Sequence, residues 1–362
     1  MSFGVIDLFN QLADNDYGFF QRINSISDIM TADVKKLTLD DTFEQTSALF
    51  RRHGIHHAPV IADDGDIVGV VSDRDLLRHR PPLLGTAAEG DNDQLALRSP
   101  ASQFMTRGTI AVSSSDAPVS ALALMLDHHV DCVLVYDANN ELEGILTSRD
   151  FMKMVLLFHQ VCTRGPDLVR FRLVDLDLKR GLPLDVIFSR GTRSVRDVMT
   201  KDVTVLSETD TIANAMDLMK SLKVRHLPVV DESTQLLGMV SDRDILEFLP
   251  LPVPRQELHR SREFREVLFA VQDDRTLQQR ITIIMNTEPT VVRENGLFTD
   301  AVNVFMNQTT SGLPVLDHDH RLCGILTTTD VLRVFRITLQ IGSLLDGDRG
   351  MGSDVEQPIG QS

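Results

Sequence analysis

Four glycine-led apolar runs each end in a serine or threonine that is followed three residues later by an aspartate. The four pairs are Ser72 and Asp75, Thr147 and Asp150, Ser241 and Asp244, and Thr327 and Asp330. This spacing is typical of a helix capping box, in which the two side chains bind backbone N–H groups. A helix start is also a ready phosphate site, and an aspartate one turn away would accept from ribose hydroxyls. On the residues alone, both interpretations stay open.

The four copies differ in the number of basic residues near the Ser/Thr and Asp pair, and a bound phosphate would need such residues. The candidates are His57 and Arg74 in the first copy, and Arg225, His226 and Arg243 in the third. The second copy has Asp131 where a cation would help, and the fourth has no base at the corresponding point. With Thr204 on its first extended stretch, the third copy has the fullest set of donors. We therefore predict that the site using Asp244 is the tightest, although an Arg-His pair on an edge strand could also be merely solvated.

The elements that must position these residues repeat with one fixed spacing. A methionine that follows an apolar residue precedes a glycine-led apolar run by 39 residues in every copy. The pairs are Met30 and Gly69, Met105 and Gly144, Met199 and Gly238, and Met285 and Gly324. Four copies without an internal insertion or deletion indicate four related units.

Each unit reads as strand, helix, strand, strand, helix, which is an α/β (α+β) pattern. In the third unit, for example, apolar residues recur at helical spacing from Ile212 through Met216 to Leu222. A unit of about 55–60 residues is too small to bury a good core alone, so the units should pair. The first and third share Ser-Asp-Arg-Asp, whereas the second and fourth run into long apolar helices, which indicates a duplicated pair.

The predicted organisation follows from these units. We predict an N-terminal helical segment (1–24), a first pair (25–160, units at about 25–80 and 100–156), a connector (161–193), a second pair (194–345, units at about 194–248 and 280–335) and a disordered tail (346–362).

The Met-Thr segment, the apolar-Pro-Val strand and the Gly-apolar-apolar-(Ser/Thr)-x-x-Asp run make the four units resemble CBS domains, named after cystathionine β-synthase. Two such domains in tandem resemble a Bateman module. The resemblance implies an adenine nucleotide (AMP, ADP or ATP) as a regulatory ligand between paired repeats. The predicted ligand-binding residues are His57, Ser72, Arg74, Asp75, Thr147, Asp150, Thr204, Arg225, His226, Ser241, Arg243, Asp244, Thr327 and Asp330.

We therefore predict a non-catalytic regulator that signals by a conformational shift. No nucleophile, base and orienting acid stand at a recognisable spacing, and no Walker loop is present. Two alternatives stay open: a structural adaptor with empty clefts, and a regulatory subunit of a separate enzyme or transporter. The apolar helices after the second and fourth units favour a homodimer.

Composition excludes other classes. A net charge of −16, 5% aromatic residues and no tryptophan argue against nucleic-acid binding. No apolar stretch approaches the length of a membrane helix, so we expect no membrane insertion. Three cysteines without metal-ligand spacing, and no recognisable signal peptide, favour a reduced, cytoplasmic protein. The histidines lack the spacing of metal ligands, so no metal is predicted.

Overall fold

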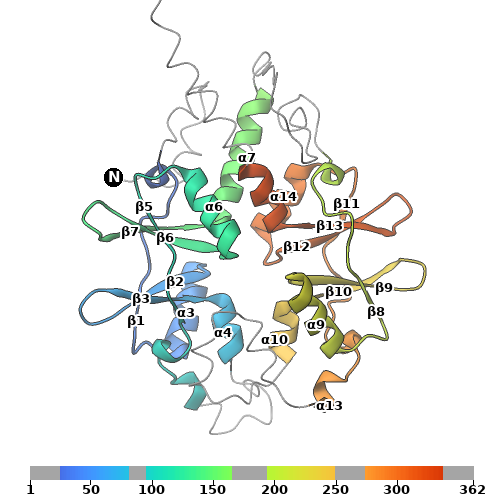
Figure 1. Ribbon diagram of the computed structural model, residues 1–362, viewed down its shortest axis with the longest axis horizontal. Helices are drawn as coiled ribbons and strands as arrows, with labels where there is room; N and C mark the ends of the chain where they lie inside the picture. The colour runs from blue at the N-terminus through green and yellow to red at the C-terminus, as the bar shows by residue number, and fades with distance from the viewer. Residues whose placement is uncertain (1–24, 81–94, 165–193, 249–273, 337–362) are drawn as a thin grey trace, which may run out of the picture.

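The computed structural model describes residues 25–80, 95–164, 194–248 and 274–336 (Figure 1). The predicted N-terminal helical segment, most of the predicted connector and the predicted disordered tail lie outside these ranges. Within them the chain forms four small units of helices and strands, here called repeats 1 to 4 in chain order. The predicted mixed α/β (α+β) architecture is confirmed.

Repeats 1 and 3 follow the same order of elements. Repeat 1 consists of η1 (Ile26–Asp28), β1 (Leu37–Thr38), α3 (Phe43–His53), β2 (His57–Ile61), β3 (Ile67–Ser72) and α4 (Asp73–His79). Repeat 3 consists of η3 (Val195–Asp197), β8 (Leu206–Ser207), α9 (Ile212–Leu222), β9 (His226–Val230), β10 (Leu236–Ser241) and α10 (Asp242–Phe248).

Repeats 2 and 4 repeat this order with small additions. Repeat 2 consists of η2 (Ala101–Gln103), β4 (Thr106–Arg107), β5 (Ala111–Ser113), α6 (Pro118–His128), β6 (Cys132–Tyr136), β7 (Leu142–Thr147) and α7 (Ser148–Arg164). Repeat 4 consists of α13 (Asp274–Leu277), η4 (Ile281–Ile283), β11 (Val292–Arg293), α14 (Phe298–Asn307), β12 (Gly312–Leu316), β13 (Leu322–Thr327) and a helix over 328–336.

In every repeat the strand that follows the long first helix (α3, α6, α9 or α14) lies between two other strands of its sheet. In repeat 3, β9 pairs in parallel with β8 and antiparallel with β10. The Arg-His pair therefore does not stand on an edge strand, which corrects the alternative interpretation given above. The first strand of repeat 3, β8, covers only two residues. Thr204 therefore lies before this strand, in exposed, irregular chain.

Local sequence signals mark the ends of helix α3 and the start of helix α6. Thr42 caps α3 with Gln45 in a capping box, and Gly54 ends it with a left-handed φ of 60°. Pro118 occupies the first turn of α6, where its missing N–H costs nothing. These short-range signals explain why helix positions followed directly from the sequence.

The methionine and the glycine that recur 39 residues apart do not touch each other within a repeat; each contacts its counterpart in the paired repeat. A Cβ added to Gly69 would lie 2.9 Å from Met105 Sδ, and one added to Gly238 would lie 3.1 Å from Met285 Sδ. Gly144 and Gly324 meet Met30 and Met199 in the same way. Each methionine thus packs on the glycine of the other repeat in its pair, and only glycine leaves room for it.

Backbone pairing follows the same exchange. Thr31 pairs with Ile145, and Thr200 pairs with Ile325, so the segment that leads into one repeat extends the sheet of its partner. In return, β4 of repeat 2 adds a fourth strand to the sheet of repeat 1. Repeats 1 and 2 therefore form one module, and repeats 3 and 4 form the other.

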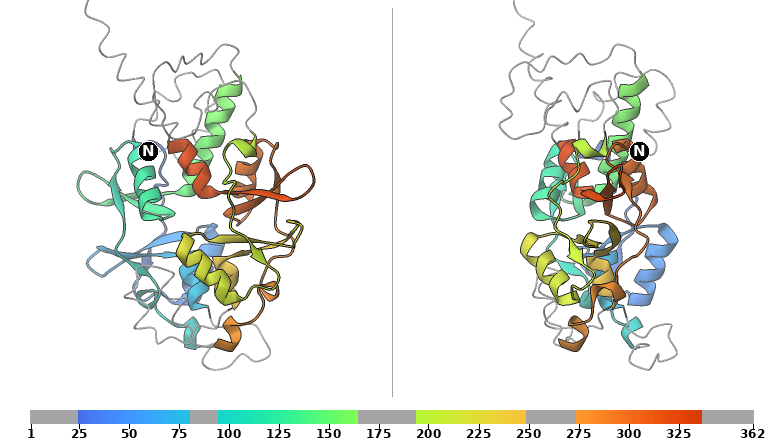
Figure 2. Two further views of the ribbon diagram at one scale, coloured as in Figure 1. Left: turned by 45° about the vertical axis from the view of Figure 1, so that its right-hand side comes forward. Right: turned by 90° about the vertical axis from the view of Figure 1, so that its right-hand side faces the viewer.

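The two modules stand side by side, with repeat 1 beside repeat 3 and repeat 2 beside repeat 4 (Figures 1 and 2). Repeats 2 and 4 share one apolar core, in which the rings of Phe151 and Phe335 stand 6.4 Å apart. Helices α4 and α10 meet between repeats 1 and 3. The described parts of the helices that end repeats 2 and 4 are buried within one chain, and the homodimer stays a prediction.

Candidate functional site

Each Ser/Thr-x-x-Asp pair is hydrogen-bonded at the start of the second helix of its repeat, and in repeats 1, 3 and 4 the aspartate N–H also donates to the hydroxyl, which completes a capping box. In repeat 3, the Ser241 N–H and hydroxyl donate to Asp244 Oδ2 over 2.6 and 2.7 Å. The corresponding hydroxyl-to-carboxylate distances in repeats 1, 2 and 4 are 2.6, 2.7 and 2.6 Å. One carboxylate oxygen of every box is therefore used by the cap, and the capping interpretation is confirmed.

The second carboxylate oxygen distinguishes the four boxes. Asp75 Oδ1 accepts from Thr106 over 3.2 Å, and Asp330 Oδ1 accepts from Thr200 over 3.4 Å. Asp150 Oδ1 accepts from Lys153 over 2.9 Å. These three aspartates are buried, with exposed fractions of 3% to 8%. Burial raises the pKa of Asp330 against the hydrogen bonds from Thr327.

Asp244 differs from the other three. It is partly exposed, and its Oδ1 has no hydrogen-bond partner in the part of the chain that the structure describes. Two donors that satisfy the other boxes are replaced here: Asn286 stands where Thr106 and Thr200 bond Asp75 and Asp330, and Glu247 stands where Lys153 bonds Asp150. The Asn286 side-chain oxygen accepts from the Glu288 N–H over 3.0 Å. An oxygen of Asp244 is thus left able to accept from a ligand.

The predicted phosphate-binding arginines converge where the modules meet, and they hold carboxylates there. Asp131 Oδ2 lies 2.5 Å from Arg74 Nη1 and 3.3 Å from Arg225 Nη1. Burial alone would raise the pKa of the Asp131 carboxyl, but the two guanidinium charges outweigh it and hold the pKa below its usual range. This carboxylate thus joins arginines from repeats 1 and 3.

Repeats 1 and 3 also exchange ion pairs through their shared Ser-Asp-Arg-Asp boxes. Arg243 Nη2 lies 2.7 Å from Asp73 Oδ2, and Arg74 Nε lies 3.5 Å from Asp242 Oδ2. His56 Nδ1 lies 3.4 Å from the same oxygen of Asp73. Burial would raise the pKa of Asp73, but the hydrogen bond from His56 and the charge of Arg243 lower it to about 2. The charges of the two boxes therefore join the two modules.

Two predicted basic residues are neutral in this setting. Burial lowers the pKa of His226 to about 4, although Asp242 acts in the opposite direction. Its Nε2 lies 3.1 Å from Ser311 Oγ, and its ring packs where a Cβ of Gly312 would stand. Burial also lowers the pKa of His57. These histidines offer hydrogen bonds at neutral pH, and not positive charge.

Four segments of the chain, 26–81, 101–157, 195–251 and 281–337, match the CBS domain and together cover more than half of it. The chain belongs to the CBS domain family. Its four CBS repeats form two tandem Bateman modules, as predicted.

Individual relatives cover different parts of the chain. CBSX1 of Arabidopsis thaliana, a chloroplastic CBS domain-containing protein, is 31% identical over 153 residues, which cover 40% of this chain and 64% of CBSX1. The chain thus spans less than two thirds of that relative. The crystal structure of MJ1225 from Methanocaldococcus jannaschii is 18% identical and covers 84% of this chain and 96% of MJ1225 with a TM-score of 0.53, which shows the same fold. A structure of CBSX2 in complex with AMP is 30% identical and covers 41% of this chain and 98% of its own, with a TM-score of 0.32.

The structure brings together part of the predicted site of CBS repeat 3. Ser241 and Asp244 meet in the cap, and Arg225 and Arg243 reach the junction of the modules, whereas His226 contacts Ser311 of repeat 4 within its own module. Thr204 is exposed and makes no hydrogen bond to the described part of the chain. That these residues bind a ligand stays a prediction.

Sequence reasoning missed the acidic partners of the arginines. Asp73 and Asp242 lie inside the boxes but were not considered, and Asp131 was noted only as an unfavourable replacement. The available signal was Ser-Asp-Arg-Asp itself, which carries opposite charges side by side in both repeats that meet.

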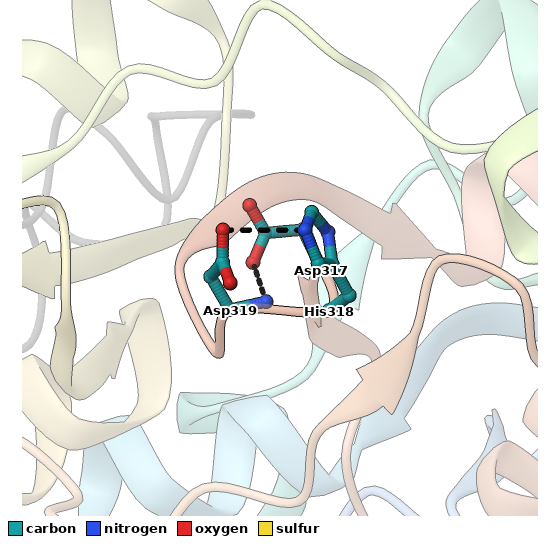
Figure 3. A group of neighbouring side chains, drawn as sticks. All are labelled: Asp317, His318 and Asp319. Carbon is teal, nitrogen blue, oxygen red and sulfur yellow. Dashed lines mark hydrogen bonds and ion pairs between the residues drawn. The ribbon is translucent and has the colours of Figure 1, made fainter.

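A group of possible metal ligands occurs in the turn between β12 and β13 of CBS repeat 4 (Figure 3). It consists of Asp317, His318 and Asp319, whose polar atoms lie within 4.8 Å of one another. Asp317 Oδ1 accepts from the N–H groups of Asp319 and Arg321 over 2.8 and 2.9 Å. Asp137 and Asp231 form the same turn in repeats 2 and 3 without a histidine. The turn explains this arrangement without a metal.

No helix within the described ranges is long and apolar enough to cross a lipid bilayer.

Proposed function

We propose that this CBS protein is a non-catalytic regulator that binds an adenine nucleotide in the second module, with Asp244 accepting from the ribose hydroxyls. The observation that carries the proposal is the Oδ1 of this partly exposed carboxylate, which has no hydrogen-bond partner among the described residues. The capping aspartates of the other repeats are buried and use both oxygens. The hydroxyls of a ribose would donate to Asp244 Oδ1, which none of the described residues does.

Arg243 supports a phosphate-bearing ligand at the same site. It follows the buried Asp242 and immediately precedes Asp244, and its guanidinium reaches the junction between repeats 1 and 3. There it contacts Asp73 and donates to the Thr309 carbonyl over 2.6 Å. A phosphate that approached Arg243 would compete with Asp73.

This competition provides a route from ligand to regulation. The Arg243–Asp73 ion pair joins the two modules, so a ligand that weakens it favours a different arrangement of repeats 1 and 3. A ligand that binds one arrangement more tightly shifts the population toward it. A partner protein that recognises one arrangement would then respond to nucleotide. The identity of that partner as an enzyme or transporter, a homodimer and a cytoplasmic location all stay predictions.

Calorimetry with AMP, ADP and ATP tests the proposal. Asp244→Ala should weaken binding by about one to two decades, because hydrogen bonds to a charged group contribute roughly 1.5–3 kcal/mol. Asp330→Ala is the matched control, since it removes the same cap in a repeat whose carboxylate is buried and satisfied. Both variants should unfold at lower temperature, but only Asp244→Ala should lose affinity. Equal affinity in Asp244→Ala and the unchanged chain would contradict the assignment.

One observation favours a ligand-free adaptor as a second candidate. Arg74, Arg225 and Arg243 already hold carboxylates, so the junction is electrostatically satisfied without a ligand. If AMP, ADP, ATP and S-adenosylmethionine all fail to raise the melting temperature, the adaptor is the better account.

A further inference from the structure

Asp131 stands at a position that carries a base in two other repeats. Its carbonyl accepts from the Ser148 N–H over 2.9 Å, and the carbonyl of Arg225 accepts from the Asp242 N–H over 3.0 Å. The two residues therefore occupy corresponding places just before the middle strand of their sheets. Repeat 1 has His56 there. Repeat 2 alone among the four has a negative charge at this place.

One oxygen of this carboxylate holds two guanidinium groups from different modules. Arg74 approaches Asp131 Oδ2 from repeat 1 and Arg225 approaches it from repeat 3. Arg225 also donates to the His129 carbonyl over 3.1 Å, which fixes it on repeat 2. Phosphate oxygens take the same kind of contact with paired guanidinium groups.

The cluster can be reached from solvent. The side chain of Asp131 is 28% exposed and that of Arg225 is 38% exposed, while that of Arg74 is 14% exposed. An anion in solution can therefore approach the arginines, but it meets a carboxylate that already occupies them. The net charge of −16 adds to the repulsion.

We propose that Asp131 acts as an internal anion that occupies Arg74 and Arg225 and thereby discriminates against ligands rich in phosphate. A pyrophosphate or triphosphate group must displace this carboxylate before it can use the two arginines. For nucleotides the inference rests on the proposed function, but the competition between Asp131 and a phosphate group does not. Asp131 is thus a residue that sets specificity, in addition to its part in joining the modules.

Inorganic pyrophosphate probes the cluster directly in calorimetry on the full chain. Asp131→Asn should bind pyrophosphate at least about tenfold more tightly than the unchanged chain, because two charged donors lose their internal partner. Adding Arg225→Ala to this variant should remove the gain. Asp127→Asn is the matched control: Asp127 is 67% exposed in the same repeat and pairs at 3.5 Å with Arg336, away from the cluster. It should leave pyrophosphate binding unchanged.

A purely structural ion pair predicts a different result. Asp131→Asn would then lower the melting temperature without any gain in pyrophosphate affinity, and that outcome overturns the proposal. Asp131→Ser is a second variant, to be used if Asp131→Asn does not fold. Serine should be tolerated there, because repeat 4 has Ser311 at the corresponding place. It should show the same gain, and unchanged binding in a folded Asp131→Ser chain also overturns the proposal.

Adenosine and AMP separate this proposal from the function proposed above. Adenosine has no phosphate, so Asp131→Asn should leave its affinity unchanged while that of AMP rises. If the unchanged chain binds both but Asp131→Asn gains affinity for neither pyrophosphate nor AMP, the role of Asp131 is wrong and the nucleotide site stands. If Asp131→Asn gains pyrophosphate binding while no chain binds adenosine or AMP, the role of Asp131 stands and the nucleotide site is wrong.

Discussion

Protonation of His226 should weaken the folded state between pH 7 and pH 4. The ring packs against Gly312, near three arginines, and its pKa falls from 6.5 to about 4 because burial disfavours the charged form. The unfolded chain therefore binds more protons than the folded chain within this window, so stability falls as the pH is lowered. The loss begins near pH 6.5 and is complete below pH 4.

The size of the effect follows from the two pKa values. A pKa lowered from 6.5 to about 4 corresponds to roughly 3 kcal/mol of unfolding free energy when fully expressed. About 2 kcal/mol of this should appear between pH 7 and pH 5, since most unfolded chains have gained the proton by pH 5. Such a difference lies well above the error of a denaturant titration.

Urea unfolding of the full chain at pH 7, 6 and 5 measures this loss. The chain has no tryptophan, so far-ultraviolet circular dichroism is the suitable probe. His226→Gln keeps a group able to bind Ser311 but removes the titration, and its stability should fall about 2 kcal/mol less between pH 7 and pH 5. His318→Gln is the control, because that side chain is 84% exposed. If the unchanged chain and His226→Gln lose stability in parallel, the account of a buried neutral imidazole is refuted.

Two further predictions concern packing. Gly238→Ala should lower the unfolding free energy by about 1–3 kcal/mol, because the new Cβ would stand 2.6 Å from the Asn286 carbonyl oxygen; an unchanged urea midpoint would show that the contact between the repeats can relax. Phe335→Ala should cost about 3–5 kcal/mol, since this buried ring fills the core shared by repeats 2 and 4. Leu222→Ala, at a side chain 47% exposed, should change the urea midpoint little, and a similar loss in both variants would contradict the shared core.

The fold could be predicted because its signals are local and occur four times. Ile212 and Met216 recur at helical spacing and are buried in α9, whereas Leu222 at the end of the helix is exposed. The Ser/Thr-x-x-Asp spacing gave the second helices their starting points. Repetition then separated the pattern from chance.

The charged junction could not be predicted in the same way. Arg74 and Asp131, or Arg243 and Asp73, are brought together by the pairing of whole repeats, and no spacing along the chain encodes that pairing. The sequence indicated that Arg225 and Arg243 could bind a phosphate. It did not indicate that carboxylates from other repeats would already be paired with these arginines. The expected edge-strand position of Arg225 and His226 was wrong for a related reason, since the parallel pairing of β8 with β9 makes β9 a central strand.

The residues that recur in all four repeats have structural roles that are now visible. The serine or threonine and the aspartate start helices, and the methionine and the glycine lock repeats in pairs. A residue needed four times for folding cannot by itself say which site binds a ligand. That information lies in the departures from the repeat. Where Asn286 replaces threonine, an oxygen of Asp244 has no partner among the described residues, and Asp131 in place of a base occupies the arginines of two other repeats. Asn286 and Asp131 are therefore the two positions that distinguish one site of this CBS protein from the others. Substitution at either position should change ligand binding.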